Sequence, residues 1–175
     1  MKNTKHSHFG GIIKKSALAI IATAVVLTTS IAQAEIKPAV VYDTAGKNDK
    51  SFNEAVFNGI TKFMNDTGIA VTELEPTNEA MMEQSLKKFA QRGYSPVVAV
   101  GFTMANAVAA AAAEYPDTQF TIIDGVVDAP NVQNVVFKEH EGSFLVGVMA
   151  AMASSTGTVG FVGGMDIPLI SRFEC

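Results

Sequence analysis

Residues 97–114 read VVAVGFTMANAVAAAAAE, and this stretch decides the fold class. Its first four residues are apolar without interruption, which is typical of a strand that is buried on both faces. The alanine-rich run from Met104 to Glu114 predicts a helix directly after that strand. A strand of this kind followed by a helix is the repeating unit of a parallel sheet that helices cover.

The same alternation extends in both directions from this unit. Residues 51–65, for example, place apolar side chains three or four positions apart, which makes one apolar helix face. We expect strands at 39–42, 69–74, 97–100, 120–123, 132–137 and 159–162, and helices at 51–65, 78–92, 104–114 and 141–154. The predicted fold class is α/β, with a doubly wound parallel sheet.

The first 34 residues have the pattern of a secretory signal peptide. Lys14 and Lys15 precede an uncharged apolar run at 17–27, and Ala32-Gln33-Ala34 supplies the small residues that signal peptidase recognises. The run is shorter than the about 20 apolar residues of a membrane anchor. No cysteine lies near the cut, which argues against a lipid anchor. We expect export to the periplasm, cleavage after Ala34, and no membrane insertion afterwards.

The composition of the mature chain excludes several classes of function. The signal segment removes four of the 13 basic residues and none of the 17 acidic ones, which leaves a net charge of −8. Nucleic acids and anionic membranes reward clustered basic residues, so neither is an expected partner. Cys175 is the single cysteine and His140 the single mature histidine, which excludes an internal disulfide and a zinc site of the usual type.

Several candidate ligand residues follow the predicted strands at their carboxyl ends, where doubly wound sheets bind ligands. Asp43 ends the first strand and Asp124 the fourth, and either could accept from a ligand or be an ordinary loop residue. Gly101 and Phe102 follow the third strand, where the glycine permits close backbone approach. Thr103 is a candidate N-cap for the next helix.

The segment 51–54 reads Ser-Phe-Asn-Glu and fits a capping box, with Ser51 as N-cap and Glu54 bonding back to it. Phe52 and Asn53 would then lie in the first helical turn, where an aromatic face, an amide and free N–H groups can meet a polar ligand. Phe52 could equally belong to the core, and Asp49 could be a solvated loop charge.

Enzyme motifs are missing from the sequence. It has no Gly-x-Ser-x-Gly elbow, no P-loop, and no Gly-x-Gly-x-x-Gly after the first strand. Any nucleophile–base arrangement would have to use carboxylates alone. Asp43 and Asp49 are the one pair of loop carboxylates that are close in sequence. Because the enzyme motifs are missing, binding without chemistry and without a cofactor is the better prediction.

Residues 43–53, DTAGKNDKSFN, resemble the opening Asp-x-Gly-x-x-Asp-Asp-x-Ser-Phe-Asn motif of the basic membrane protein family. These are substrate-binding proteins of ABC transporters and include purine nucleoside receptors. Residues within 101–124, 131–147 and 156–173 resemble the family as well, so the resemblance covers essentially all of the mature chain. Asn48 departs from the motif, since the family commonly has an acidic residue there.

The resemblance implies a periplasmic-binding-protein type I fold, in which two α/β lobes close on a ligand. It assigns Phe52 to stacking on a base, Asp43 to lining the pocket, and Asp49 and Asn53 to neighbouring polar contacts. Asp124 would hydrogen-bond the base. By the family pattern 35–137 form the first lobe and 138–175 begin the second, so we expect the chain to be an N-terminal fragment of a longer protein.

Three functions follow as hypotheses. The first is a periplasmic component of an ABC importer that delivers a purine nucleoside to a membrane permease. The second is a sensor-type module that presents a small molecule to a membrane receptor. The third, a nucleoside-acting enzyme, would need the paired carboxylates named above.

Overall fold

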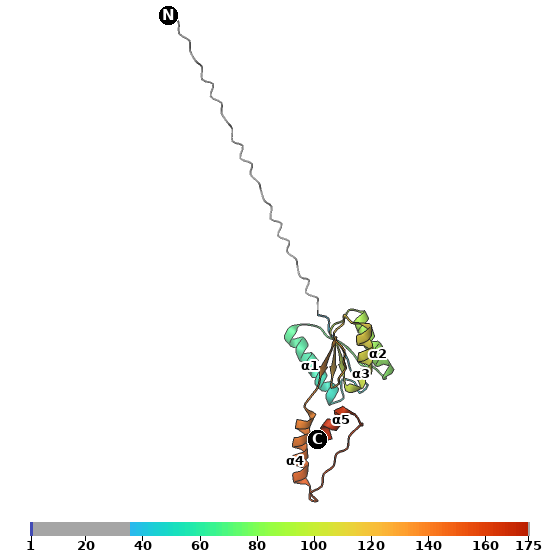
Figure 1. The fold of residues 1–175 in the computed structure, drawn as a ribbon, viewed down its shortest axis with the longest axis vertical. Coiled ribbons are helices and arrows are strands. Elements are labelled where there is room, and N and C mark those ends of the chain that lie inside the picture. Colours follow the sequence, from blue (N-terminus) through green and yellow to red (C-terminus); the bar gives the residue numbers. More distant parts are fainter. Residues whose placement is uncertain (2–35, 175) are drawn as a thin grey trace. The chain divides into compact units, whose positions relative to one another are not determined.

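The computed structural model describes residue 1 and residues 36–174, and the latter form an α/β fold (Figure 1). The predicted signal peptide and its cleavage point therefore lie outside the described residues, except for Met1. The strands are β1 (Ala39–Val41), β2 (Thr72–Leu74), β3 (Val97–Val100), β4 (Phe120–Ile123) and β5 (Val132–Val135). The helices are α1 (Phe52–Thr67), α2 (Ala80–Gln91), α3 (Ala105–Glu114), α4 (Glu139–Ala153) and α5 (Pro168–Glu174), with a 3-10 helix η1 (Phe102–Met104).

The sheet is parallel throughout and has the order β2-β1-β3-β4-β5. From β1 the chain runs outward to β2 and then returns past β1 to β3. The direction of the winding therefore reverses between β1 and β3, which makes that pair of carboxyl ends the topological switch point. The predicted parallel α/β fold is confirmed.

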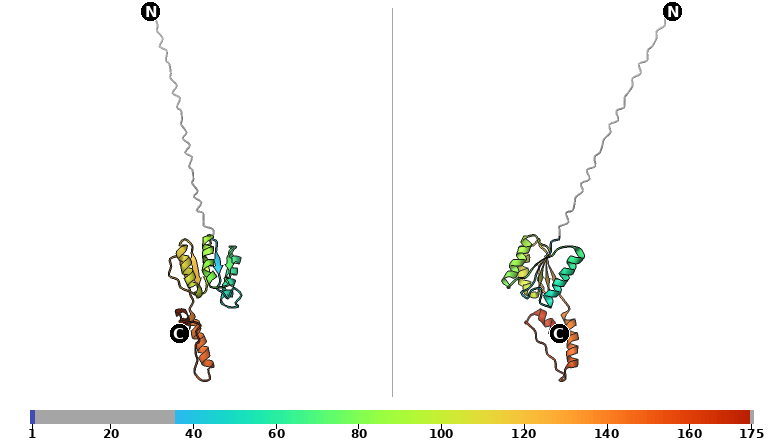
Figure 2. Two further views of the ribbon diagram at one scale, coloured as in Figure 1. Left: turned by 90° about the vertical axis from the view of Figure 1, so that its right-hand side faces the viewer. Right: turned by 180° about the vertical axis from the view of Figure 1, so that it is seen from behind.

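Helices cover both faces of the sheet, α1 on one face and α2 with α3 on the other (Figures 1 and 2). Successive side chains of a strand point to opposite faces, so β1 supplies both cores. Ala39 and Val41 pack in the larger core with α2 and α3, whereas Val40 and Tyr42 pack in the smaller core under α1. Burial, and next the Glu73 carboxylate that accepts from its hydroxyl at 2.6 Å, raise the pKa of Tyr42.

Two predicted strands differ from the structure. The strand predicted at 69–74 is confined to Thr72–Leu74, because it pairs with β1, which is itself three residues long. The strand predicted at 159–162 is wrong: these residues are exposed and have no strand conformation. A strand requires a neighbour for its backbone hydrogen bonds, and the described sheet ends at β5.

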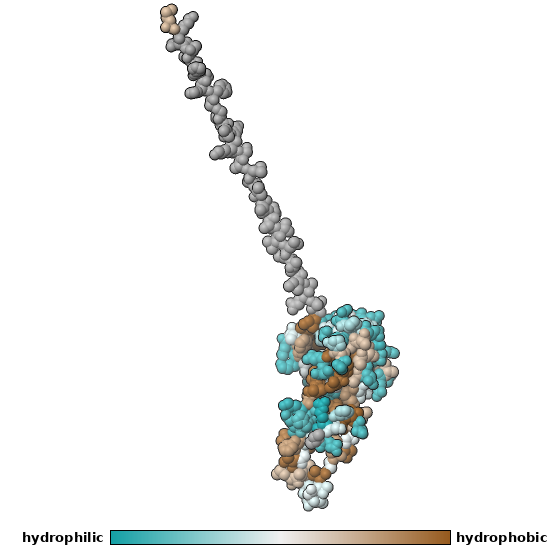
Figure 3. Space-filling model, viewed as in Figure 1, coloured by the Kyte–Doolittle hydropathy of each residue, from teal (hydrophilic) through white to brown (hydrophobic). Residues whose placement is uncertain are grey.

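The boundaries near the C-terminus also shift. The fifth strand ends at Val135 rather than 137, and α4 begins at Glu139 rather than 141. Helix α5 was not predicted, although Pro168 at its first position is a typical helix start. In this segment α4 is apolar around most of its circumference, with Phe144 66% and Met152 82% exposed (Figure 3).

Candidate functional site

The carboxyl ends of β1 and β3 bring four of the predicted ligand residues together. The side-chain amide of Asn53, in the first turn of α1, donates to Asp43 Oδ1 at 2.7 Å. A methyl group built on Gly101 would lie 3.5 Å from Asp43 Oδ2 and 3.8 Å from the Phe52 ring. Asp43, Phe52, Asn53 and Gly101 therefore form one cluster at the switch point of the sheet.

Gly101 is needed at this place for its backbone as well as its size. Its φ of 99° and ψ of 147° lie in a region that is essentially restricted to glycine. Its N–H donates to the carbonyl of Ile123 at 2.9 Å, which joins the end of β3 to the end of β4. The turn thus joins the ends of β3 and β4 and leaves Gly101 next to Asp43 and Phe52.

The cap of α1 differs from the predicted capping box. Ser51 precedes the helix but makes no side-chain capping hydrogen bond. Asp49 instead accepts from the backbone N–H groups of Ser51, Asn53 and Glu54 at 2.8, 3.0 and 3.0 Å. Desolvation raises the pKa of the Asp49 carboxyl, but these N–H groups outweigh it and lower the pKa. Asp49 therefore orients the turn that carries Phe52 and Asn53, with its oxygens directed at the helix backbone.

A second capping prediction is also wrong. Thr103 lies inside η1, and Met104 occupies the N-cap of α3 without a side-chain capping bond. The 3-10 turn uses the residues that a side-chain cap would have needed. Phe102, the first residue of η1, is half-buried, and its Cα lies 3.4 Å from a methyl group built on Gly125. The backbone of Phe102 therefore lies against the loop after β4, and Phe102 does not line the hollow described below.

Asn53 is a buried polar residue with unused hydrogen-bonding capacity. It is 1% exposed, and its Oδ1 has no hydrogen-bond partner among the described residues. Buried polar atoms are nearly always paired in native proteins. The amide nitrogen is committed to Asp43, so the open oxygen marks this cluster as a place where a donor is missing.

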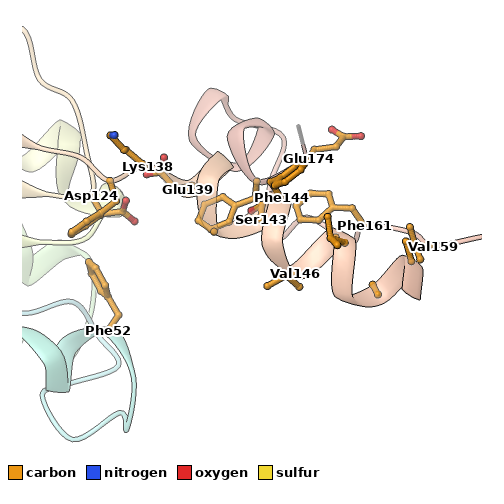
Figure 4. A pocket seen from close by; sticks show the side chains of 18 residues that line it. Phe52, Asp124, Lys138, Glu139, Ser143, Phe144, Val146, Val159, Phe161 and Glu174 are labelled. Carbon is orange, nitrogen blue, oxygen red and sulfur yellow. The ribbon is translucent and has the colours of Figure 1, made fainter. Parts of the chain in front are cut away.

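An open hollow of about 1160 Å³ lies beside this cluster (Figure 4). Of the predicted ligand residues, Phe52 and Asp124 line it, and both are half-buried. The remaining wall comes from residues 137–174, chiefly from α4 with Phe144 and Val148, and from Phe161. A polar rim with an aromatic ring therefore faces a mostly apolar wall.

Asp124 occupies an unusual backbone conformation and an unfavourable electrostatic environment. Its φ is 62°, a left-handed value that Asp tolerates better than most residues. Burial raises the pKa of its carboxyl, the nearby charge of Glu139 raises it further, and Arg172 acts in the opposite direction. Perturbed carboxyl groups that line a cleft are typical of functional sites.

Glu139 is the residue of this region that the sequence analysis did not select. It begins α4, lines the hollow and is 8% exposed. Neither carboxylate oxygen has a hydrogen-bond partner in the described chain, although Arg172 Nη1 lies 3.6 Å from Oε2. The one feature of the sequence that could have indicated Glu139 is its position as an acidic residue directly before an apolar helical run. That position is more typical of an exposed first helical turn than of a buried site residue.

Two kinds of feature are absent from the described residues. No group of three His, Cys, Asp or Glu side chains among them is arranged to hold a metal ion. Within the same residues, no helix has the length and apolar character to cross a membrane.

A family model of PnrA-like ABC transporter substrate-binding proteins, the Bmp family, matches residues 36–175. The chain belongs to the Bmp family. This confirms the resemblance read from residues 43–53 and from the three later stretches.

Individual relatives agree with the family assignment. The chain is 31% identical over 177 residues to the ABC transporter nucleoside-binding protein BmpA of Lactococcus lactis, covering 93% of this chain and 50% of that protein. Basic membrane protein A of Borreliella burgdorferi is 29% identical over 131 residues, which is 73% of this chain and 38% of that protein.

Among solved structures, an ABC transporter solute-binding protein from Aeropyrum pernix superposes with a TM-score of 0.69 and 32% identity. The match covers 79% of this chain and 40% of that one. The chain thus spans about half or less of the length of these relatives.

Proposed function

We propose that this Bmp chain binds a purine nucleoside at the carboxyl edge of its sheet, as part of the substrate-binding component of an ABC importer. The observation that carries the proposal is the cluster of Phe52, Asp43 and Asn53 at the switch point. Asp124, the residue directly after β4, lines the same hollow as Phe52. The name of the Lactococcus lactis relative supports the ligand class.

The chemistry of the cluster suits a nucleoside. A base is a flat aromatic group with hydrogen-bonding edges, so it can stack on the Phe52 ring, an interaction worth about 1–3 kcal/mol per base. In this proposal Asp124 accepts a hydrogen bond from the edge of that base. Asp43, whose Oδ1 is held by Asn53 and by the N–H of Ala45 at 2.8 Å, retains Oδ2 for a ligand hydroxyl.

The remaining parts of the proposal concern organisation and location. Residues 35–137 act as the first ligand-binding lobe, and 138–175 contribute to the second. The signal pattern that ends at Ala34 directs the chain to the periplasm, where a membrane permease receives the ligand. No described feature favours the sensor or enzyme alternatives.

Titration calorimetry on the purified protein with inosine, adenosine and guanosine tests the ligand class, with riboflavin and ribose as controls. We expect saturable binding of at least one nucleoside and none of the controls. Chromatography of the mixture should recover intact nucleoside. Binding confined to ribose or riboflavin would overturn the nucleoside proposal, and release of free base would replace it with an enzyme.

A further inference from the structure

We propose that Glu139 is a further ligand-contacting residue, whose carboxylate lies beside that of Asp124 and accepts hydrogen bonds from N–H or O–H donors of the ligand. This inference rests on the proposed function, since it takes the ligand to be a nucleoside. It adds a specificity residue from α4 to the cluster at the switch point.

The burial of Glu139 is the first argument. Its side chain is 3% exposed, and neither oxygen accepts a hydrogen bond from the described residues. A buried carboxylate is costly unless it is both paired and hydrogen-bonded. Arg172 supplies partial charge compensation at 3.6 Å, but at that distance both oxygens still lack donors.

The position of Glu139 is the second argument. It lines the same hollow as Phe52 and Asp124, and Figure 4 shows these side chains gathered at the sheet end of the hollow. Lys138, the neighbouring cation, is turned to the exposed Glu141, whose Oε1 accepts from its Nζ at 2.9 Å. Lys138 lines the hollow as well, but its ammonium is paired with Glu141, so Glu139 and Asp124 present carboxylate acceptors that are not paired with it.

An ionised carboxylate can accept hydrogen bonds but cannot donate them. Two of them side by side select a ligand that offers donors and reject one that offers acceptors at the same place. Inosine carries such donors at N1–H of the base and at the 2′-, 3′- and 5′-hydroxyls of the sugar. The donor that meets Glu139 is the N1–H of the base or a sugar hydroxyl, and analogues that each lack one donor distinguish the two.

The test compares Glu139→Gln with Glu79→Gln by titration calorimetry against inosine. A hydrogen bond to a charged group contributes an amount equivalent to roughly 10- to 100-fold in affinity. We expect Glu139→Gln to weaken inosine binding at least about tenfold. Glu79→Gln, the same change at an exposed residue that does not line the hollow, should alter it less than about twofold.

Inosine analogues that each lack one donor then identify the contact: 1-methylinosine and the 2′-, 3′- and 5′-deoxyinosines. The analogue that lacks the donor to Glu139 should bind the unmodified protein and Glu139→Gln with nearly equal affinity. If every analogue loses the same factor on substitution, Glu139 acts only by anchoring α5 through Arg172, and the inference is overturned.

Other outcomes are equally decisive. Inosine binding that is unchanged in Glu139→Gln overturns this inference and leaves the proposed function intact. No nucleoside binding to the unmodified protein overturns the proposed function and this inference together. Should Glu139→Gln fail to fold, Glu139→Asp, which keeps the charge near Arg172 but withdraws the carboxylate by one methylene, carries the same prediction.

Discussion

The turn at Gly101 provides a direct test of the site's geometry through the substitution Gly101→Ala. With φ of 99° and ψ of 147°, an alanine there would be strained by about 1–3 kcal/mol. The added methyl would meet Asp43 Oδ2 at 3.5 Å and Phe52 Cε1 at 3.8 Å, which are ordinary contacts. The cost to ligand-free stability should therefore come from the backbone and not from a clash.

Gly59→Ala is the matched control. Gly59 lies within α1, and a methyl group there would have no atom within 4 Å. Alanine should stabilise that helix by about 0.5–1 kcal/mol. Both substitutions reduce the freedom of the unfolded chain to the same degree, so the difference between the two variants isolates the strain at Gly101.

Thermal unfolding followed by circular dichroism measures this difference. A domain of this size loses about 4 °C of melting temperature per kcal/mol, so Gly101→Ala should melt roughly 4–12 °C below Gly59→Ala. Nucleoside affinity should fall in Gly101→Ala, because the methyl narrows the space between Asp43 and Phe52, and it should be unchanged in Gly59→Ala. Equal melting temperatures for the two variants would refute the strained-turn reasoning.

Three further substitutions extend the test. Phe52→Ala should cost about 1–3 kcal/mol of nucleoside affinity. If the affinity is unchanged and the ligand-free protein loses about 3–5 kcal/mol of stability, as in a core Phe→Ala change, then Phe52 is a core residue instead. Asn131→Ala should lower the unfolding free energy by about 1–3 kcal/mol, measured by urea denaturation. Asn131 is buried, and its Nδ2 donates to the carbonyls of Ala112, Tyr115 and Thr118 at 3.2, 3.1 and 2.9 Å. An unchanged denaturation midpoint would contradict this prediction. The raised pKa of Asp124 means that the folded protein holds this proton more tightly, so the unfolding free energy should fall as the pH rises from the ordinary value of 3.8 through the raised one. Asp124→Asn should remove that part of the slope in melting curves between pH 4 and 7, and parallel curves for the two proteins would argue against it.

The sequence was sufficient to predict the layers of the fold and most of the residues that meet at the switch point. The apolar runs at 39–42, 97–100 and 120–123 have few alternatives to a buried parallel strand, and each was placed correctly within a residue. Asp43 and Gly101 followed from those strands, because residues after parallel strands share one edge. The run at 159–162 had the same apolar character but no strand beside it in the described sheet, and local pattern does not encode the presence of a neighbour.

Errors at the helix starts have a different cause. Ser51 and Thr103 are good capping residues by type. The N–H groups of α1 are nevertheless capped by Asp49, which lies before the predicted capping box at 51–54. The loop 43–50 folds back before the helix, and side-chain reach across such a loop is a three-dimensional property. Glu139 was not predicted for the same reason, since Arg172, whose Nη1 lies 3.6 Å from its carboxylate, is 33 positions later in the chain.

The polar groups around the hollow share one energetic property, which links the fold to the proposed binding. Asn53 Oδ1 and both Glu139 oxygens are buried without hydrogen-bond partners in the described chain, and the pKa of Asp124 is raised in the direction that disfavours its charge. Each of these groups costs stability in the ligand-free protein. A ligand that supplies donors to them would recover that free energy on binding, in addition to the stacking on Phe52. The same groups should therefore make the free protein less stable and the complex more stable. Substitutions at Asp124 or Glu139 that stabilise the free protein should weaken the binding of the ligand.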